Sequence, residues 1–309
     1  MRTRPSEAPH DSRTVVGVDG SQHARAAALW GAADAMRHGR GLVLVHALDL
    51  DRLDRFASYE TSEHVRAAGS DLLAEAAAEV RQGFPELDVT VKLSRRKPVA
   101  ALHASVRPSG TIVVGSRGAG GFGPLVLGSV GLGVVVGSPA PVVVVRGETA
   151  RAHGAPVTAA VRDEHDARWL VRAGQEALAW DSPLRLVSVR NLLARFGARQ
   201  LPHDEAGRDA DPGERPVEAL ASRIREGRPG LTVRTEVVEA RSTASALVEA
   251  SRHAQLLVMG SHERRGVSVL GLGHVVHALL HHSHCPVQIV PYLRDAGGVA
   301  GEGLAEGED

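Results

Sequence analysis

The sequence has little of several features that would each indicate a class of protein. It contains one cysteine, Cys285, which excludes an intrachain disulfide and fits a reducing, cytoplasmic compartment. Only 3% of its residues are aromatic, which leaves few side chains for stacking nucleic-acid bases. Lysine and arginine balance aspartate and glutamate at 36 residues each, so no net charge attracts the chain to nucleic acid or to a membrane.

An apolar leader and a clear membrane span are also missing. Residues 1–13 are polar and charged, so we expect a flexible tail there instead of a secretory signal. The uncharged stretch Phe122–Val145 is long enough to cross a bilayer, but glycines and prolines interrupt it. Its counterpart in the second half of the chain carries histidines. We therefore interpret this stretch as a buried turn, helix and strand.

Common catalytic signatures are absent as well. The sequence has no Gly-x-Ser-x-Gly nucleophile elbow, no His-Glu-x-x-His zinc motif and no Walker phosphate loop. The run Asp163–Asp166 has the residue types of a carboxylate–imidazole site. Acidic residues also favour the first turn of a helix, and we expect a helix start at this run.

What the sequence does have is an internal repeat. Its 309 residues suffice for two domains of about 150 residues each. An offset of 145 places Ile112–Ser116 on Leu257–Ser261, and an offset of 143 places Val18 on Val161. The repeat divides the chain into a flexible tail at 1–13, a domain at 14–147, a linker at 148–156, a second domain at 157–293 and a disordered tail at 294–309.

Within the first domain, short β-branched runs alternate with helical patterns. We expect strands at Thr14–Val18, Leu42–Ala47, Leu87–Leu93, Thr111–Val114 and Val142–Arg146, and helices at Ser21–His38, Glu60–Arg81, Pro98–Val106 and Ser129–Gly137. Apolar strands that alternate with helices indicate an α/β fold with a mostly parallel sheet covered on both faces. Each half is then a doubly wound, Rossmann-like domain, which binds ligands at the carboxyl ends of its strands.

A glycine-rich pattern follows the expected strand Thr111–Val114. Its spacing is Gly-x2-Gly-x9-Gly-Ser, from Gly115 and Gly118 to Gly128 and Ser129. The first two glycines can adopt backbone angles closed to other residues and let backbone amides approach a ligand. Gly128 and Ser129 open the next helix, where unbonded N–H groups attract phosphate. We expect Ser129 to be both the N-cap and a hydroxyl donor.

These segments resemble the universal stress protein family, in its ATP-binding branch, over nearly the whole chain and in both halves. The matching segments are Val15–Ser21, Gly115–Phe122, Leu127–Val130 and Ala140–Val145, with His281–Val287 closing the second half. The resemblance implies a five-stranded sheet in each domain. It also implies a dimer through the last strand, Val142–Val145, although the two halves of a tandem chain could pair with each other instead.

The resemblance further implies an ATP site, with Mg²⁺, in the first domain. The adenine would contact the backbone near Gly17, Val18 and Ala47, and Asp19 would lie close to the ribose or the metal. The residues expected to bind ATP are Gly17, Val18, Asp19, Ala47, Val114, Gly115, Arg117, Gly118, Gly128, Ser129 and Val130. Two of them have ordinary alternatives: Asp19 could cap a turn, and Arg117 could be an exposed loop residue.

The second domain differs at matched positions of this site. The replacements are Arg162 for Asp19, Glu263 for Gly118 and His274 for Ser129. An acidic side chain at position 263 would cover the bare backbone and repel phosphate. We predict that this domain does not bind ATP in the family manner.

Histidines gather in the same half. His274, His277 and His281 share one helical face, a spacing that could hold zinc. The run His281–Cys285 is, however, similar to the ordinary closing segment of the family, and no second Cys/His cluster lies at finger spacing. We predict no metal site here.

The sequence therefore predicts an ATP-binding stress-response regulatory protein, in which the first domain holds the nucleotide as a switch or sensor. We expect at most slow ATP hydrolysis and no dedicated enzyme activity. Two alternatives stay open: a ligand-free tandem scaffold that acts through protein–protein contacts, and a weak ATPase.

Overall fold

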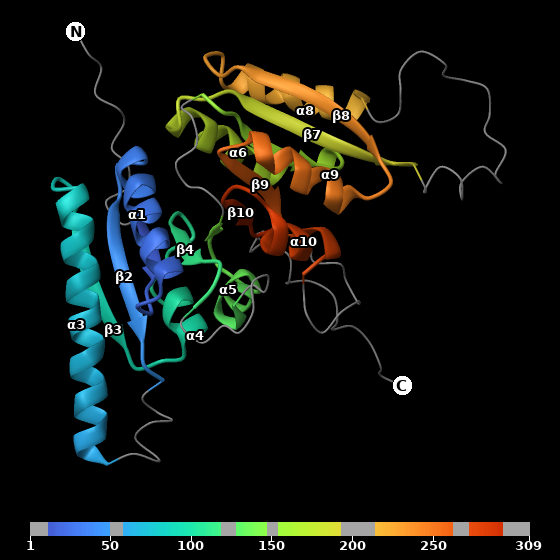
Figure 1. The fold of residues 1–309 in the computed structure, drawn as a ribbon. Helices are drawn as coiled ribbons and strands as arrows, with labels where there is room; N and C mark the ends of the chain where they lie inside the picture. Colours follow the sequence, from blue (N-terminus) through green and yellow to red (C-terminus); the bar gives the residue numbers. More distant parts are fainter. Residues whose placement is uncertain are drawn as a thin grey trace, which may run out of the picture.

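The computed structural model describes residues 12–49, 58–118, 128–146, 154–192, 214–261 and 272–292 (Figure 1). Several predictions fall outside these ranges. They are the C-terminal tail at 294–309, residues 1–11 of the N-terminal tail, residues 148–153 of the linker, and Glu263.

The first half alternates strands and helices as predicted, with ends that differ by a few residues. Its elements are β1 Arg13–Gly17, α1 Gln22–Arg37, β2 Gly41–Ala47, α3 Tyr59–Gly83, β3 Val89–Ser94, α4 Pro98–His103, β4 Thr111–Gly115, α5 Ser129–Val135 and β5 Val142–Val145. Local chemistry explains several ends. The Ser21 hydroxyl accepts a hydrogen bond from the Ala24 N–H (3.1 Å) and so caps α1. Pro98 occupies the first turn of α4, where no N–H is needed.

The second half repeats this order. Its elements are β6 Val157–Val161, η1 Glu164–Asp166, α6 Ala167–Ala179, β7 Leu184–Asn191, α8 Glu214–Gly227, β8 Val233–Ala240, α9 Thr243–Ala250, η2 Ser251–His253, β9 Leu256–Gly260, α10 His274–His282 and β10 Val287–Val290. The acidic run Asp163–Asp166 forms a helix start, as predicted, because the Asp163 and Asp166 side chains make a reciprocal capping box around η1.

The strands of the described residues form one ten-stranded sheet, in the order β3-β2-β1-β4-β5-β10-β9-β6-β7-β8. Pairs within each half are parallel, and the halves meet where β5 and β10 pair antiparallel, with Val287 opposite Val144. Each half thus contributes five strands. The two last strands pair within one chain, and both edges of each are occupied.

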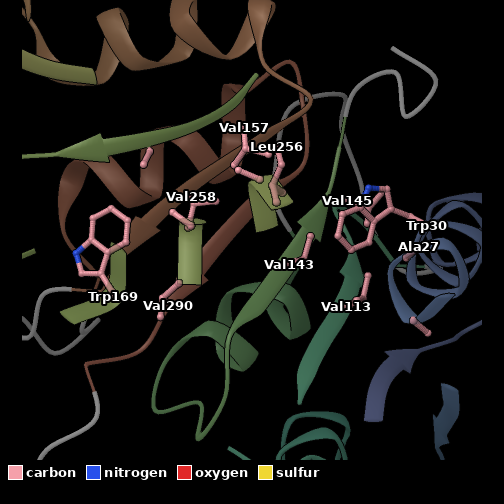
Figure 2. Packing of buried hydrophobic residues seen from close by; sticks show 14 of the residues in the cluster. Ala27, Trp30, Val113, Val143, Val145, Val157, Trp169, Leu256, Val258 and Val290 are labelled. Atoms are coloured by element: carbon pink, nitrogen blue, oxygen red, sulfur yellow. The ribbon is translucent and has the colours of Figure 1, made fainter. Parts of the chain in front are cut away.

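Helices cover both faces of the sheet. Successive residues of a strand point to opposite faces, so Val142 and Val143 belong to different apolar clusters. The cluster that contains Val143 packs under α1, α3, α6 and α8, and the other packs under α4, α5, α9 and α10. In Figure 2, Trp30 and Trp169 lie on opposite sides of buried strand residues from both halves, among them Val143, Val145, Val258 and Val290. The predicted class, tandem doubly wound α/β domains, is confirmed.

A buried polar network joins α1 to α6 across the two halves. Asp34 and Glu176 are both fully buried, and His38 lies between them. The His38 Nδ1 atom is 3.3 Å from Asp34 Oδ1, and its Nε2 atom is 3.5 Å from Glu176 Oε2. Glu176 Oε1 also accepts hydrogen bonds from Arg172 Nε (2.8 Å) and Gln288 Nε2 (2.9 Å).

Within the described ranges, no helix combines the length and apolar character needed to cross a membrane.

Candidate functional site

A cavity of about 360 Å³ lies at the carboxyl ends of β1, β2 and β4. This is where a doubly wound sheet binds ligands. All eleven residues selected from the sequence line it: Gly17, Val18, Asp19, Ala47, Val114, Gly115, Arg117, Gly118, Gly128, Ser129 and Val130. The structure therefore brings together residues from four separate segments of the first half.

The turn between β1 and α1 forms one wall. Asp19 Oδ1 accepts a hydrogen bond from the Ser21 N–H (3.0 Å), and Gly20 between them has a φ of +80° that favours glycine. The other carboxylate oxygen, Oδ2, faces Gly118, where an added Cβ would lie only 2.5 Å from it. Asp19 thus caps the turn, as its ordinary interpretation predicts, and it also lines the cavity.

The glycines after β4 are needed for space. A Cβ on Gly115 would lie 2.6 Å from the backbone oxygen of His23, because the end of β4 packs directly on the start of α1. Neither Gly115 nor Gly118 is among the glycines with positive φ, so the expectation of special backbone angles at these two positions is wrong. The backbone of His23 excludes a side chain at Gly115, whereas a side chain at Gly118 would have to displace the Asp19 carboxylate.

The start of α5 forms the opposite wall. Gly128 has the extended N-cap backbone (φ −62°, ψ 148°), and its N–H donates to the Ser116 carbonyl (3.1 Å). The prediction that Ser129 is the N-cap is therefore wrong, because Ser129 is already the first helical residue. The first bond of the helix runs from Leu132 N–H to Gly128 O (3.1 Å), so the amides of residues 129–131 have no acceptor within the helix.

Several residues that line the cavity were not selected from the sequence. They are Ala24, Val45, His46, Pro98, Leu102 and Gly131. His46 pairs through Nδ1 with the Val18 carbonyl (2.7 Å), and the Val18 N–H donates to Val45 O (2.9 Å). The position of His46 at the end of a predicted strand was the available signal. Pro98 and Leu102 belong to α4, which carries no motif.

A second cavity, of about 440 Å³, occupies the equivalent place in the second half. Arg162 and His274 line it, as the repeat predicts. Trp169 lines it as well, and its indole lies so close to Gly260 that a Cβ there would be 2.5 Å from the ring. The Asp166 carboxylate, 1% exposed, accepts hydrogen bonds from the Arg162 N–H (2.7 Å) and the Trp169 indole N–H (2.8 Å). Each cavity is lined by one aspartate and one arginine, but Arg162 and His274 stand at the positions of Asp19 and Ser129, and the described lining of the first cavity contains no tryptophan.

The structure also places the possible metal ligands. The rings of His277 and His281 on α10 stack with centroids 4.3 Å apart. Within the described part of the chain, only Asp34, His38 and Glu176 bring three ligand atoms within 4.8 Å of one another. Guanidinium groups around those carboxylates, including Arg172, already balance their charge, so we interpret this cluster as the polar network between the halves.

Fold and cavity together define a class: two doubly wound α/β domains in tandem, with a glycine-lined cavity in the first. The model of the universal stress protein family matches residues 12–146 and again 155–291. The chain belongs to the universal stress protein family.

Individual proteins are similar to this chain in sequence or in fold. A universal stress protein of Mycobacterium tuberculosis is 30% identical over 295 residues, which cover 88% of this chain and 95% of that protein. The crystal structure of a universal stress protein from Archaeoglobus fulgidus shares the fold, with a TM-score of 0.65 at 18% identity, covering 91% of this chain and 98% of that one. A shorter family member, solved in complex with cAMP, is 23% identical and covers 45% of this chain and 98% of that chain, at a TM-score of 0.31. The cAMP complex is a property of that protein.

Proposed function

We propose that the first half binds ATP, with Mg²⁺, in the cavity at the ends of β1, β2 and β4, and that the protein is a stress-response regulator. One observation carries the proposal: the eleven residues selected as an ATP site come from four distant segments and line one cavity. Its volume of about 360 Å³ lies within the range of small-molecule sites.

The glycine wall suits a phosphate chain. Gly115 and Gly118 leave the backbone bare on one side, and the amides of residues 129–131 begin α5 on the other. Backbone N–H groups without helical partners bind anions, and glycine lets phosphate oxygens come close to them. Arg117 lines the same cavity and adds a guanidinium that pairs well with phosphate.

The remaining walls suit the base and the metal. Ala24, Val45, Pro98 and Leu102 provide apolar surface for a flat base. Asp19 is the one acidic side chain among the described residues of the lining. Mg²⁺ is commonly held by one or two carboxylates together with phosphate oxygens, so Asp19 would contact the ion bound to the nucleotide.

The cavity favours binding over catalysis. His46 is the one imidazole among the described lining residues, and its Nδ1 atom is engaged by the Val18 carbonyl. The Val18 carbonyl holds the proton on Nδ1 and leaves Nε2 as the basic nitrogen of the ring. The described lining supplies no lysine and no second imidazole to assist it, so the groups that a dedicated ATPase would need are not gathered there. We therefore propose a nucleotide switch or sensor, with slow hydrolysis at most.

Equilibrium dialysis of the nucleotide-stripped full chain against labelled ATP and Mg²⁺ tests the proposal. We expect one ATP per chain, because the second cavity has Arg162 and His274 at the positions of Asp19 and Ser129 and is lined by the Trp169 indole. No retained ATP would favour the ligand-free scaffold, and two equivalents would show that the second half is also a nucleotide site. Steady-state release of ADP would instead make the protein an ATPase.

We propose further that the two halves of one chain pair with each other through β5 and β10, so that no second chain is needed for this pairing. Since β5 and β10 have no open edge, a homodimer through the last strands would require this junction to separate. Sedimentation should therefore show a monomer.

We also propose a cytoplasmic location, where the buried Cys285 would stay reduced.

A further inference from the structure

A third cavity, of about 730 Å³, lies between the two halves, and we call it the junction cavity. It exists because β5 and β10 pair antiparallel: the carboxyl end of β5 lies beside the amino end of β10. Its lining comes from both halves and consists of His23, Ala26, Ser116, Arg117, Val145, Arg146, Val248, His282, Ser283 and His284.

The polar lining is basic. Two arginines and three histidines line the junction cavity, and none of the described residues around it is an aspartate or a glutamate. Arg117 and Arg146 are both half-buried. Burial lowers the pKa of Arg146, and the positive charge of Arg117 lowers it further. Two guanidinium groups that repel each other at a partly dry site are an electrostatic cost, which a bound anion would remove.

The fold alone does not require these charges. The repeat places Pro291 at the position of Arg146 in the other half. It likewise places Gly137 at the position of His282, and Pro139 at that of His284. The repeat relates the junction cavity to a place at the opposite end of the β5–β10 pair. That place lacks the counterparts of Arg146, His282 and His284, although the same two strands border it. Arg146, His282 and His284 are therefore particular to this junction, whereas the position matched to Arg117 carries His262, which lies outside the described residues.

We propose that the junction cavity is a binding site for an oxyanion of the phosphate class, held between Arg117 and Arg146. Guanidinium groups bind phosphate through two parallel N–H···O bonds, and two of them can hold one phosphate from opposite sides. His23 and His282 line the same space and add N–H donors. This site is distinct from the proposed nucleotide cavity: Arg117 lines both, but Arg146 and His282 line only the junction cavity.

Calorimetric titration of inorganic phosphate into the nucleotide-stripped full chain, at constant ionic strength, tests this proposal. We expect the wild-type protein to have a phosphate site that depends on Arg146, in addition to any phosphate bound at the glycine wall of the nucleotide cavity. Arg146→Gln should weaken phosphate binding about tenfold or more, because it removes a charge-assisted pair. Arg252→Gln is the matched control, because Arg252 is an exposed arginine that pairs with Glu249 (2.9 Å). The phosphate affinity of this variant should equal that of the wild-type protein.

A second variant separates the charge from the fold. Arg146 donates to the Leu280 carbonyl (3.5 Å), so its loss could loosen the junction, and thermal melting must accompany the titration. His282 is exposed, and His282→Glu leaves that hydrogen bond intact while adding a negative charge, so it should also weaken phosphate binding. Absence of phosphate binding to the wild-type protein, or wild-type affinity in both variants, would overturn the proposal. Dialysis against ATP reports on the nucleotide cavity separately. Both variants should still bind ATP.

Discussion

Gly118 faces the Asp19 carboxylate so closely that a side chain there must displace it. We predict that Gly118→Glu, which copies the residue at position 263, abolishes ATP binding to the first half. The Cβ would lie 2.5 Å from Asp19 Oδ2, and the new carboxylate would stand where phosphate is expected. Two like charges about 4 Å apart repel by roughly 1 to 4 kcal/mol, which weakens binding by about fivefold to several hundredfold, and the loss of charge-assisted hydrogen bonds to phosphate weakens it further. Equilibrium dialysis measures the loss.

Gly83→Glu provides the control for this substitution. Gly83 ends α3, is exposed, and has nothing within 4 Å of an added Cβ. It should bind ATP like the wild type, and both variants should keep the wild-type circular dichroism spectrum. Unchanged affinity in the Gly118 variant would mean that the glycine wall does not contact the nucleotide.

At the scale of residues, the sequence predicts which positions share the cavity better than it predicts what each does. Strand ends converge in a doubly wound sheet, so motifs at strand ends can be placed together without a structure. Contacts made by apolar residues outside motifs, such as Leu102, cannot. The cap of α5 was assigned one residue late, because glycine and serine both suit an N-cap and only the backbone angles of Gly128 distinguish them.

At the scale of elements, the approach of α1 to β1 depends on Gly31. A Cβ there would lie 2.6 Å from the Val16 Cγ2 atom, and Val16 is a short, fully buried side chain that cannot move aside. Alanine is the better helix former, by roughly 0.5–1 kcal/mol. Overpacking of a core commonly costs about 1–3 kcal/mol. We therefore predict that Gly31→Ala lowers the free energy of unfolding, measured by urea denaturation.

Gly83→Ala is the comparison for that measurement. Its Cβ meets nothing within 4 Å, so the helix preference should stabilise the protein slightly or leave it unchanged. If both alanine variants gain stability, α1 can shift away from the sheet more easily than the packing indicates.

The elements themselves were largely predictable, because local pattern and tertiary role agree in them. Valine-rich runs such as Val142–Val145 are buried on both faces, which is the environment that a continuous apolar strand requires. Ends were less predictable. The helix at Pro98 stops at His103, where the sequence favoured Val106, because a turn precedes β4. Such ends depend on tertiary contacts as well as on propensity.

At the scale of the whole molecule, the sequence left open whether the last strands pair within or between chains. Both runs are short and apolar, and pairing in either manner satisfies their hydrogen bonds equally well. The structure resolves the choice within one chain, with β10 beside β5. The polar contacts that accompany this pairing, such as that between His38 and Glu176, join residues 138 positions apart and leave no local signal in the sequence.

The network between α1 and α6 makes this arrangement sensitive to pH. Burial lowers the pKa of His38, but the hydrogen bond and charge of Asp34 and the charge of Glu176 outweigh it, so the pKa lies above its ordinary value. Arg37, Arg40 and Arg172 are the other charged groups near the two carboxylates. Histidine is the side chain whose ordinary pKa lies closest to neutral pH, so His38 is the group in this network that we expect to titrate between about pH 6 and pH 9.

A raised pKa in the folded state means that protonation of His38 stabilises the folded protein. This contribution is fully present below about pH 6.5, the ordinary value for histidine, and is lost as the pH rises through the higher folded value. We predict that the free energy of unfolding falls over this interval in the wild-type protein, by about 1.4 kcal/mol for each unit by which the folded pKa exceeds the unfolded one. His38→Gln, which keeps a polar side chain but cannot titrate, should show a flatter profile in urea denaturation between pH 6 and pH 9. If the free energy of unfolding had the same slope against pH in both proteins, the pH dependence would belong to groups other than His38. Protonation of His38 would then not stabilise the junction between the halves.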